Sequence, residues 1–120
     1  MNIYKELLLE HYRNPRNRGN LDGADFSSQE FNPSCGDRII FQGKVQDGII
    51  SELWFTGHGC VISQATASLL IEHSCNKSVD SAKILSADDI KSMLGTELGP
   101  TRLKCALLPL QALQKGLISI

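Results

Sequence analysis

The sequence lacks any apolar stretch that could cross a bilayer, because its strongly apolar runs fall far short of the roughly 20 residues a spanning helix needs. It also lacks an excess of charge, since 12 basic and 13 acidic residues leave a net charge of −1. A surplus of one sign would attract nucleic acid or a membrane surface, so neither is expected as a partner. Residues 1–6 carry a glutamate and no apolar core, so no signal peptide is expected.

Disulfide-forming patterns are also missing. The four cysteines include no Cys-x-x-Cys pair, and a chain of 120 residues can bury a core without disulfides. With 42% hydrophobic and 21% charged residues, the composition is ordinary for a globular protein. We therefore expect one domain over residues 1–120 and a reducing, cytoplasmic location.

The first half of the chain predicts one helix followed by strands. Apolar residues at helical spacing predict an amphipathic helix over roughly residues 2–13, and residues 14–23 are typical of a loop. Asp47-Gly48 is a strong signal for a two-residue hairpin turn between two strands rich in branched and aromatic residues. The three predicted strands are residues 26–31, 39–46 and 49–55.

The second half predicts helices. One covers residues 61–74, a second runs from a cap at Ser86 to about residue 94, and a third starts at Pro100 and reaches about residue 114. Strands followed by helices favour an α+β fold. We expect a small antiparallel three-stranded sheet packed against four to five helices.

Three cysteines and one aspartate lie where a metal site could form. Cys35 and Asp37 share a Pro-Ser-Cys-Gly-Asp turn, Cys60 ends a glycine-containing run before a helix, and Cys105 lies early in the last helix. Three thiolates and a carboxylate suit tetrahedral Zn²⁺ or an iron–sulfur cluster. From spacing alone, Asp37 is explained equally well as a turn residue, and a lone cysteine is usually a small buried apolar residue.

Cys75 is excluded from this site by geometry. It follows Cys60 by fifteen residues on a predicted continuous helix, a separation of about 20 Å at the helical rise per residue. One metal ion cannot contact both, so we expect Cys75 to be a structural thiol. Likewise, we expect His11 and His73 to pack or hydrogen-bond on their helices, and His58 to be exposed.

Four segments carry recognisable motifs: His11–Gly19, Asn32–Asp37, Gly57–Ser63 and Arg102–Ala106. In this order they resemble the IscU/SufU (NifU N-terminal-like) family of iron–sulfur cluster assembly scaffolds. The resemblance implies the family's α+β fold and a metal site at Cys35, Asp37, Cys60 and Cys105. It also implies sulfur delivery from a cysteine desulfurase, Zn²⁺ as the resting metal, Fe²⁺ with a transient [2Fe–2S] cluster in function, and iron–sulfur carrier or recipient proteins as partners.

The two branches of the family are both represented in this chain. The motifs around Cys60 and Cys105 are SufU-like, yet the insertion of about twenty residues typical of SufU is absent, so the spacing is IscU-like. The IscU branch has a Leu-Pro-Pro-Val-Lys segment that a dedicated Hsp70-type chaperone reads. Here residues 98–102 read Leu-Gly-Pro-Thr-Arg, which puts recognition by such a chaperone in doubt.

Charge near the last cysteine suggests where sulfur enters. Arg102 lies three residues before Cys105 on the same helical face and could stabilise a thiolate or an anionic persulfide. Lys104 is rotated about 100° away. Pro109 cannot donate a helical hydrogen bond to the Cys105 carbonyl, which should loosen that turn. We therefore expect Cys105 to be the sulfur acceptor.

Three functions remain open. The preferred one is an assembly protein that accepts persulfide sulfur at the Cys3Asp site and holds a nascent [2Fe–2S] cluster, as a scaffold and not as a stand-alone enzyme. The second is a zinc-dependent sulfur relay, a sulfurtransferase without cluster scaffolding. The third is a structural zinc module that only binds partners.

Overall fold

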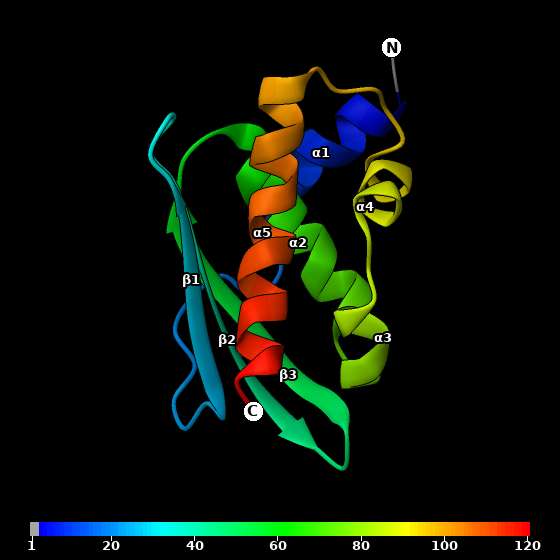
Figure 1. The fold of residues 1–120 in the computed structure, drawn as a ribbon. Coiled ribbons are helices and arrows are strands. Elements are labelled where there is room, and N and C mark those ends of the chain that lie inside the picture. Colours follow the sequence, from blue (N-terminus) through cyan, green and yellow to red (C-terminus); the bar gives the residue numbers. More distant parts are fainter. Residues whose placement is uncertain (1–2) are drawn as a thin grey trace.

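The computed structural model describes residues 3–120, and an antiparallel hairpin forms its centre (Figure 1). The strands β2 (Asp37–Gln46) and β3 (Ile49–His58) are joined by Asp47-Gly48, whose φ angles of 52° and 76° match a type I′ turn. The strand β1 (Phe26–Asn32) pairs antiparallel with β2, which gives the sheet order β1-β2-β3. The predicted three-stranded antiparallel sheet and its hairpin turn are confirmed.

Alternating side chains along the hairpin build the core. Ile39 and Phe41 on β2, and Leu53 and Phe55 on β3, are almost fully buried, while the residues between them are at least partly exposed. This period of two places the apolar side chains on one face of the sheet. Helix α5 (Pro100–Ile118) covers that face over β1 and β2, and helix α2 (Val61–Ser74) covers it over β3 (Figure 1).

The remaining helices pack against these two. Helix α1 lies on α2, and the short helices α3 and α4 lie against α5. Residue 2, where the first helix was predicted to begin, lies outside the described part of the chain. Within residues 3–120, no helix combines the length and apolarity needed to cross a bilayer. The bounds are α1 Ile3–Arg13, α2 Val61–Ser74, α3 Val79–Lys83, α4 Ala87–Leu94 and α5 Pro100–Ile118.

The helix boundaries depart from the prediction at the end of the chain. Helix α5 continues past residue 114 to Ile118, and Gly116 lies inside it. A Cβ atom at Gly116 would lie 2.6 Å from both Phe26 and Ser28, so this glycine lets the helix approach β1 and does not end it. Helix α5 also runs through Pro109 without a break. The five-residue helix α3 was not located from sequence because it is too short to show periodicity.

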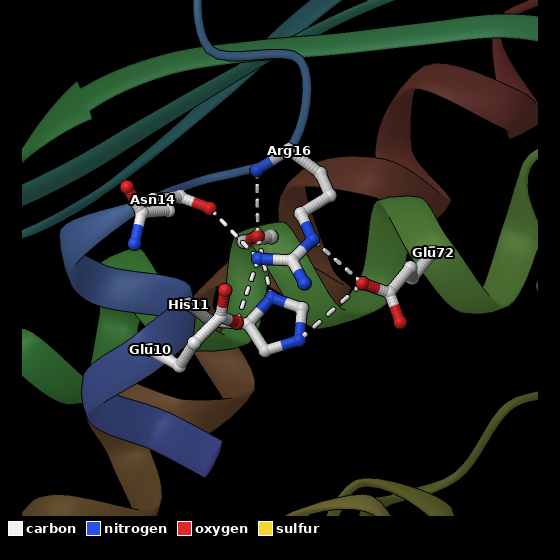
Figure 2. A network of polar contacts seen from close by, with 6 residues as sticks. Glu10, His11, Asn14, Arg16 and Glu72 are labelled. Carbon is white, nitrogen blue, oxygen red and sulfur yellow. Dashed lines mark hydrogen bonds and ion pairs between the residues drawn. The ribbon is translucent and has the colours of Figure 1, made fainter. Parts of the chain in front are cut away.

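A buried polar network fixes α1 to α2 (Figure 2). The imidazole Nδ1 of His11, a side chain only 1% exposed, lies 2.7 Å from the Ser68 hydroxyl. That hydroxyl also accepts the backbone N–H of Arg16 at 2.9 Å. The Arg16 guanidinium pairs with Glu72 and with Glu10, both at 2.7 Å, and Glu72 lies 3.5 Å from His11 Nε2. His11 therefore hydrogen-bonds on its helix, as expected.

His11 is held in its neutral form. Burial of the ring lowers the pKa of His11, and the nearby Arg16 cation lowers it further, against the opposing effects of Glu72 and Glu10. The unfolded chain, with a histidine pKa near 6.5, therefore takes up this proton more readily than the folded chain. Stability from His11 is fully present above about pH 6.5 and is lost as the pH falls towards the folded-state value.

We expect His11→Asn, which keeps a polar group for Ser68 but cannot become charged, to weaken the acid sensitivity of folding. At pH 7.5 the variant should lose about 1–2 kcal/mol, because one buried hydrogen bond is poorly replaced. Between pH 7.5 and pH 5 its free energy of unfolding, measured by urea denaturation, should fall less steeply than that of the parent protein. His73→Asn, at an exposed position of α2, is the control. Equal slopes for the parent and His11→Asn would contradict this reading.

Candidate metal centre

The site lies at one end of the sheet, where four structural elements meet. Because β2 and β3 are antiparallel, the start of β2 lies beside the end of β3, and Arg38 pairs with His58. The turn carrying Cys35 precedes β2, and Cys60 connects β3 to α2 as the helix N-cap. The first turns of α5 reach the same end of the molecule, at the top of the view in Figure 1.

The predicted ligand residues converge here. One ligand atom each from Cys35, Asp37 and Cys105 lie within 4.8 Å of one another. Cys60 adjoins this group, because its Sγ lies 3.2 Å from Asp37 Oδ2. Cys35 and Cys60 are exposed, whereas Asp37 and Cys105 are only 2% and 6% exposed. The centre thus has two buried donors behind two that face the solvent.

The Asp37 carboxylate is the common partner of the group. Its Oδ1 accepts the backbone N–H of Cys60 at 2.9 Å, and its Oδ2 accepts the Cys60 thiol proton. This position of the carboxylate requires a glycine at residue 59, because a Cβ atom there would lie 2.1 Å from Asp37 Oδ1. Gly59 also has a φ of +142°, which favours glycine. Asp37 is therefore more than a turn residue, since it also links β2 to the start of α2.

The protonation of the metal-free site follows from these contacts. Burial opposes ionisation of Asp37, but hydrogen bonds from the Cys60 thiol and amide, and from the Cys105 and Cys35 thiols, outweigh it and lower its pKa. The pKa of Cys105 is raised to about 12 by burial and by its neighbours Cys60 and Asp37. At neutral pH the carboxyl is ionised and the Cys105 thiol keeps its proton, so metal binding must release protons.

The donor set fits a metal such as Zn²⁺ or Fe²⁺. Sulfur donors suit these ions, and a carboxylate adds a harder and more exchangeable ligand. A divalent cation would also relieve the repulsion between the buried Asp37 carboxylate and an ionised Cys105. Exposure of Cys35 and Cys60 leaves the site accessible, unlike a structural zinc site closed by four buried ligands.

An apolar cavity of about 560 Å³ opens beside Cys60 and Cys105. Arg102 lines it, whereas Lys104 lines a separate hollow next to Phe31. Arg102 therefore lines the same cavity as Cys105, and Lys104 does not. The apolar lining residues are Leu8, Leu9, Val61, Ile62 and Leu98.

Some residues lie apart from the centre, and others were missed from sequence. Cys75 is the C-cap of α2, at the opposite end of that helix from Cys60, and its thiol approaches the Ser51 carbonyl at 3.9 Å. His58 is exposed at the end of β3. Ser63 and Gln64, buried directly behind Cys60, were not identified from sequence because polar residues in a first helical turn are usually exposed.

Comparisons with known proteins agree with this arrangement. Residues 3–119 match the family model described as the NifU-like N terminal domain. The chain is 33% identical to the zinc-dependent sulfurtransferase SufU of Bacillus subtilis, covering 95% of this chain and 88% of that protein. It is 36% identical to the iron–sulfur cluster assembly scaffold protein IscU of Escherichia coli K12, covering 95% and 91%.

A solved structure has the same fold. It is described as a putative iron–sulfur cluster assembly scaffold protein for the SUF system from Fervidobacterium islandicum AW-1. The two structures superpose with a TM-score of 0.80 at 28% identity, over 96% of each chain. The resemblance noted from the motifs therefore extends over nearly the whole chain.

We expect Gly59→Ala to weaken metal binding by displacing Asp37. The added methyl group would occupy the position of the carboxylate, so Zn²⁺ affinity, measured by competition with a chromophoric chelator, should fall by about tenfold or more. Gly48→Ala is the matched control, because Gly48 also has a positive φ but nothing lies within 4 Å of the added atom. Both variants should lose thermal stability. If Gly48→Ala lost Zn²⁺ affinity, or if Gly59→Ala kept it, the claim that Gly59 makes room for the Asp37 carboxylate would be contradicted.

Proposed function

The chain belongs to the family of NifU-like N-terminal domains, and from this premise we propose that it is a scaffold on which iron–sulfur clusters are assembled for other proteins. The observation that carries the proposal is the convergence of Cys35, Asp37 and Cys105 within 4.8 Å, with Cys60 in contact with Asp37. These four residues are the proposed ligands. The cargo is an iron–sulfur cluster, [2Fe–2S], built from Fe²⁺ and sulfur.

Exposure supports a transfer role over a structural one. A cluster that is built and then released needs ligands that solvent and partners can reach, and Cys35 and Cys60 are both exposed. Zn²⁺ is the proposed resting metal, since the same donors suit it. When bound, it would lower the pKa of its thiol ligands and keep them as thiolates. A closed structural zinc module would bury all its ligands, whereas Cys35 and Cys60 are exposed here.

We propose Cys105 as the residue that accepts sulfur. Its thiolate would attack the outer sulfur of a desulfurase persulfide, so that a new S–S bond forms as the old one breaks and the desulfurase cysteine leaves as a thiolate. The cavity that Cys105 borders supports this, because Arg102 lines it and can stabilise an anionic persulfide. The buried, protonated Cys105 thiol must first lose its proton, and ligation to a metal favours that loss.

A second candidate function is a zinc-dependent sulfur relay that passes the persulfide on without building a cluster. It is favoured by the relative from Bacillus subtilis, whose name states a zinc-dependent sulfurtransferase. Both functions require a cysteine desulfurase as sulfur donor. The scaffold would pass its cluster to iron–sulfur carrier or recipient proteins, whereas the relay would pass its sulfur to a protein that accepts it. A dedicated Hsp70-type chaperone is not proposed as a partner, because residues 98–102 depart from the segment it reads.

We expect one metal ion per chain, held by the four proposed ligands. Cys35→Ser, Cys60→Ser and Cys105→Ser should each lower Zn²⁺ affinity at least tenfold, because a hydroxyl is a poor substitute for a thiolate ligand. Cys75→Ser is the matched control and should keep full stoichiometry, measured by metal analysis after dialysis. Full affinity in two of the three ligand variants would refute the assignment.

Scaffold and relay are separated by anaerobic incubation with a cysteine desulfurase, cysteine and Fe²⁺. A scaffold should develop the visible absorption of a [2Fe–2S] cluster, whereas a relay should carry transferable sulfur without it. Mass mapping of the Zn²⁺-loaded protein after brief desulfurase treatment without iron should find the first added sulfur on Cys105, and Arg102→Ala should reduce its yield severalfold. Sulfur on Cys35 or Cys60 with none on Cys105 would show that sulfur enters elsewhere.

A further inference from the structure

Two buried polar side chains stand directly behind Cys60 on helix α2. Ser63 is fully buried and Gln64 is only 6% exposed. The Gln64 side chain donates from Nε2 to Ser63 Oγ at 3.3 Å, and its Oε1 has no partner among the described residues. Burying such groups costs free energy unless they form useful hydrogen bonds, so their position beside a proposed ligand needs an explanation.

The hydrogen bonds around Ser63 leave its hydroxyl proton facing Cys60. Because Gln64 donates to Ser63 Oγ, the hydroxyl must give its own proton to another acceptor. The carbonyl oxygen of Cys60 accepts this proton at 3.2 Å. Cys60 Sγ lies 3.8 Å from the same hydroxyl; as a thiol it is the donor of that contact, and it becomes an acceptor once it has lost its proton. The carbonyl already accepts the backbone N–H of Gln64 at 3.3 Å. The hydroxyl can therefore turn to the sulfur without leaving that carbonyl unpaired.

The sulfur is already oriented for this contact. The backbone N–H of Ser63 points at Cys60 Sγ, 3.5 Å away, in the manner of a helix N-cap. On the other side of Cys60, the Asp37 carboxylate accepts hydrogen bonds from the thiol and the backbone N–H of Cys60. When Cys60 serves as a thiolate ligand it no longer donates to Asp37, and a negatively charged sulfur becomes a strong acceptor for the Ser63 hydroxyl.

We propose that Gln64 and Ser63 are positioning residues that act through Cys60. Gln64 orients the Ser63 hydroxyl, and Ser63 donates to the Cys60 sulfur when that sulfur ligates a metal or cluster. A hydrogen bond to a ligating sulfur withdraws electron density from it and fixes its direction, which tunes both the strength and the electronic properties of the bond. The inference rests on the proposed function, because it requires Cys60 to be a ligand.

The alternative is that Ser63 merely satisfies its hydroxyl on the carbonyl three residues earlier, a common local bond in helices. Thr66 provides the matched control, because its hydroxyl is buried on the same helix and has no hydrogen-bond partner among the described residues. Ser63→Ala removes the donor. Gln64→Met keeps similar volume and leaves Ser63 in place without its orienting amide. Thr66→Val removes a buried hydroxyl that does not approach Cys60.

The test uses Co²⁺ added to the metal-free full-length protein, read by the thiolate-to-cobalt charge-transfer absorption. Ser63→Ala should shift this band to longer wavelength, because a thiolate without the hydrogen bond gives up an electron more easily. It should also lower Co²⁺ affinity about tenfold. Gln64→Met should shift the band in the same direction by a smaller amount. Thr66→Val should leave the band and the affinity unchanged.

An unshifted band and parental affinity in Ser63→Ala would overturn the inference while leaving the ligand set intact. If Ser63→Ala does not fold, Gln64→Met decides, and an unshifted band in that variant overturns the inference equally. A shift of the same size in Thr66→Val would show that loss of any buried hydroxyl has this effect, which also overturns it. Failure of the parent protein to bind Co²⁺, or full affinity in Cys60→Ser, would instead refute the proposed function.

Discussion

The Asp37 carboxylate joins parts of the chain that are far apart in the sequence, and the candidate centre depends on that link. It begins β2, accepts hydrogen bonds from the amide and the thiol of Cys60 at the start of α2, and lies within 4.8 Å of the sulfur atoms of Cys35 and Cys105. A buried carboxylate without such donors would be costly, so these contacts stabilise its ionised form. Gly59 leaves the space in which the carboxylate sits.

The same link divides the site into an inner and an outer part. Asp37 and Cys105 are buried, whereas Cys35 and Cys60 face the solvent. Ligands that differ in this way suit a centre that must hold its cargo and later release it. In the proposed scaffold, the inner pair would fix the position of the cluster, and the outer pair would face a recipient protein.

The network of His11, Ser68 and Arg16 lies outside the centre but supports its surroundings (Figure 2). It holds α1 on α2, and α1 supplies part of the wall of the cavity beside Cys60 and Cys105. Charged partners at Glu10 and Glu72 are exposed enough for salt to screen them, so the buried His11–Ser68 contact is the stronger part of this attachment.

The sequence by itself determined the features that depend on neighbours along the chain. The Asp47-Gly48 turn, the cap at Ser86 and the helix over residues 61–74 were predicted from local signals, and the structure confirms each. The separation of Cys75 from Cys60 also followed from sequence, because helix length fixes it. The end of α5 did not follow: the helix was predicted to end at about residue 114 but continues to Ile118, where Gly116 packs closely against Phe26 on β1.

Only the tertiary structure decided which groups are buried and what they bond to. That Cys105 lies behind the exposed cysteines, and that Arg102 and Lys104 line different hollows, depends on how α5 packs against the sheet. The burial of Ser63 and Gln64 likewise depends on how neighbouring elements cover α2. Burial and long-range hydrogen bonds arise from segments distant in the chain, so local sequence patterns identified the cysteines but not the environment that sets their chemistry.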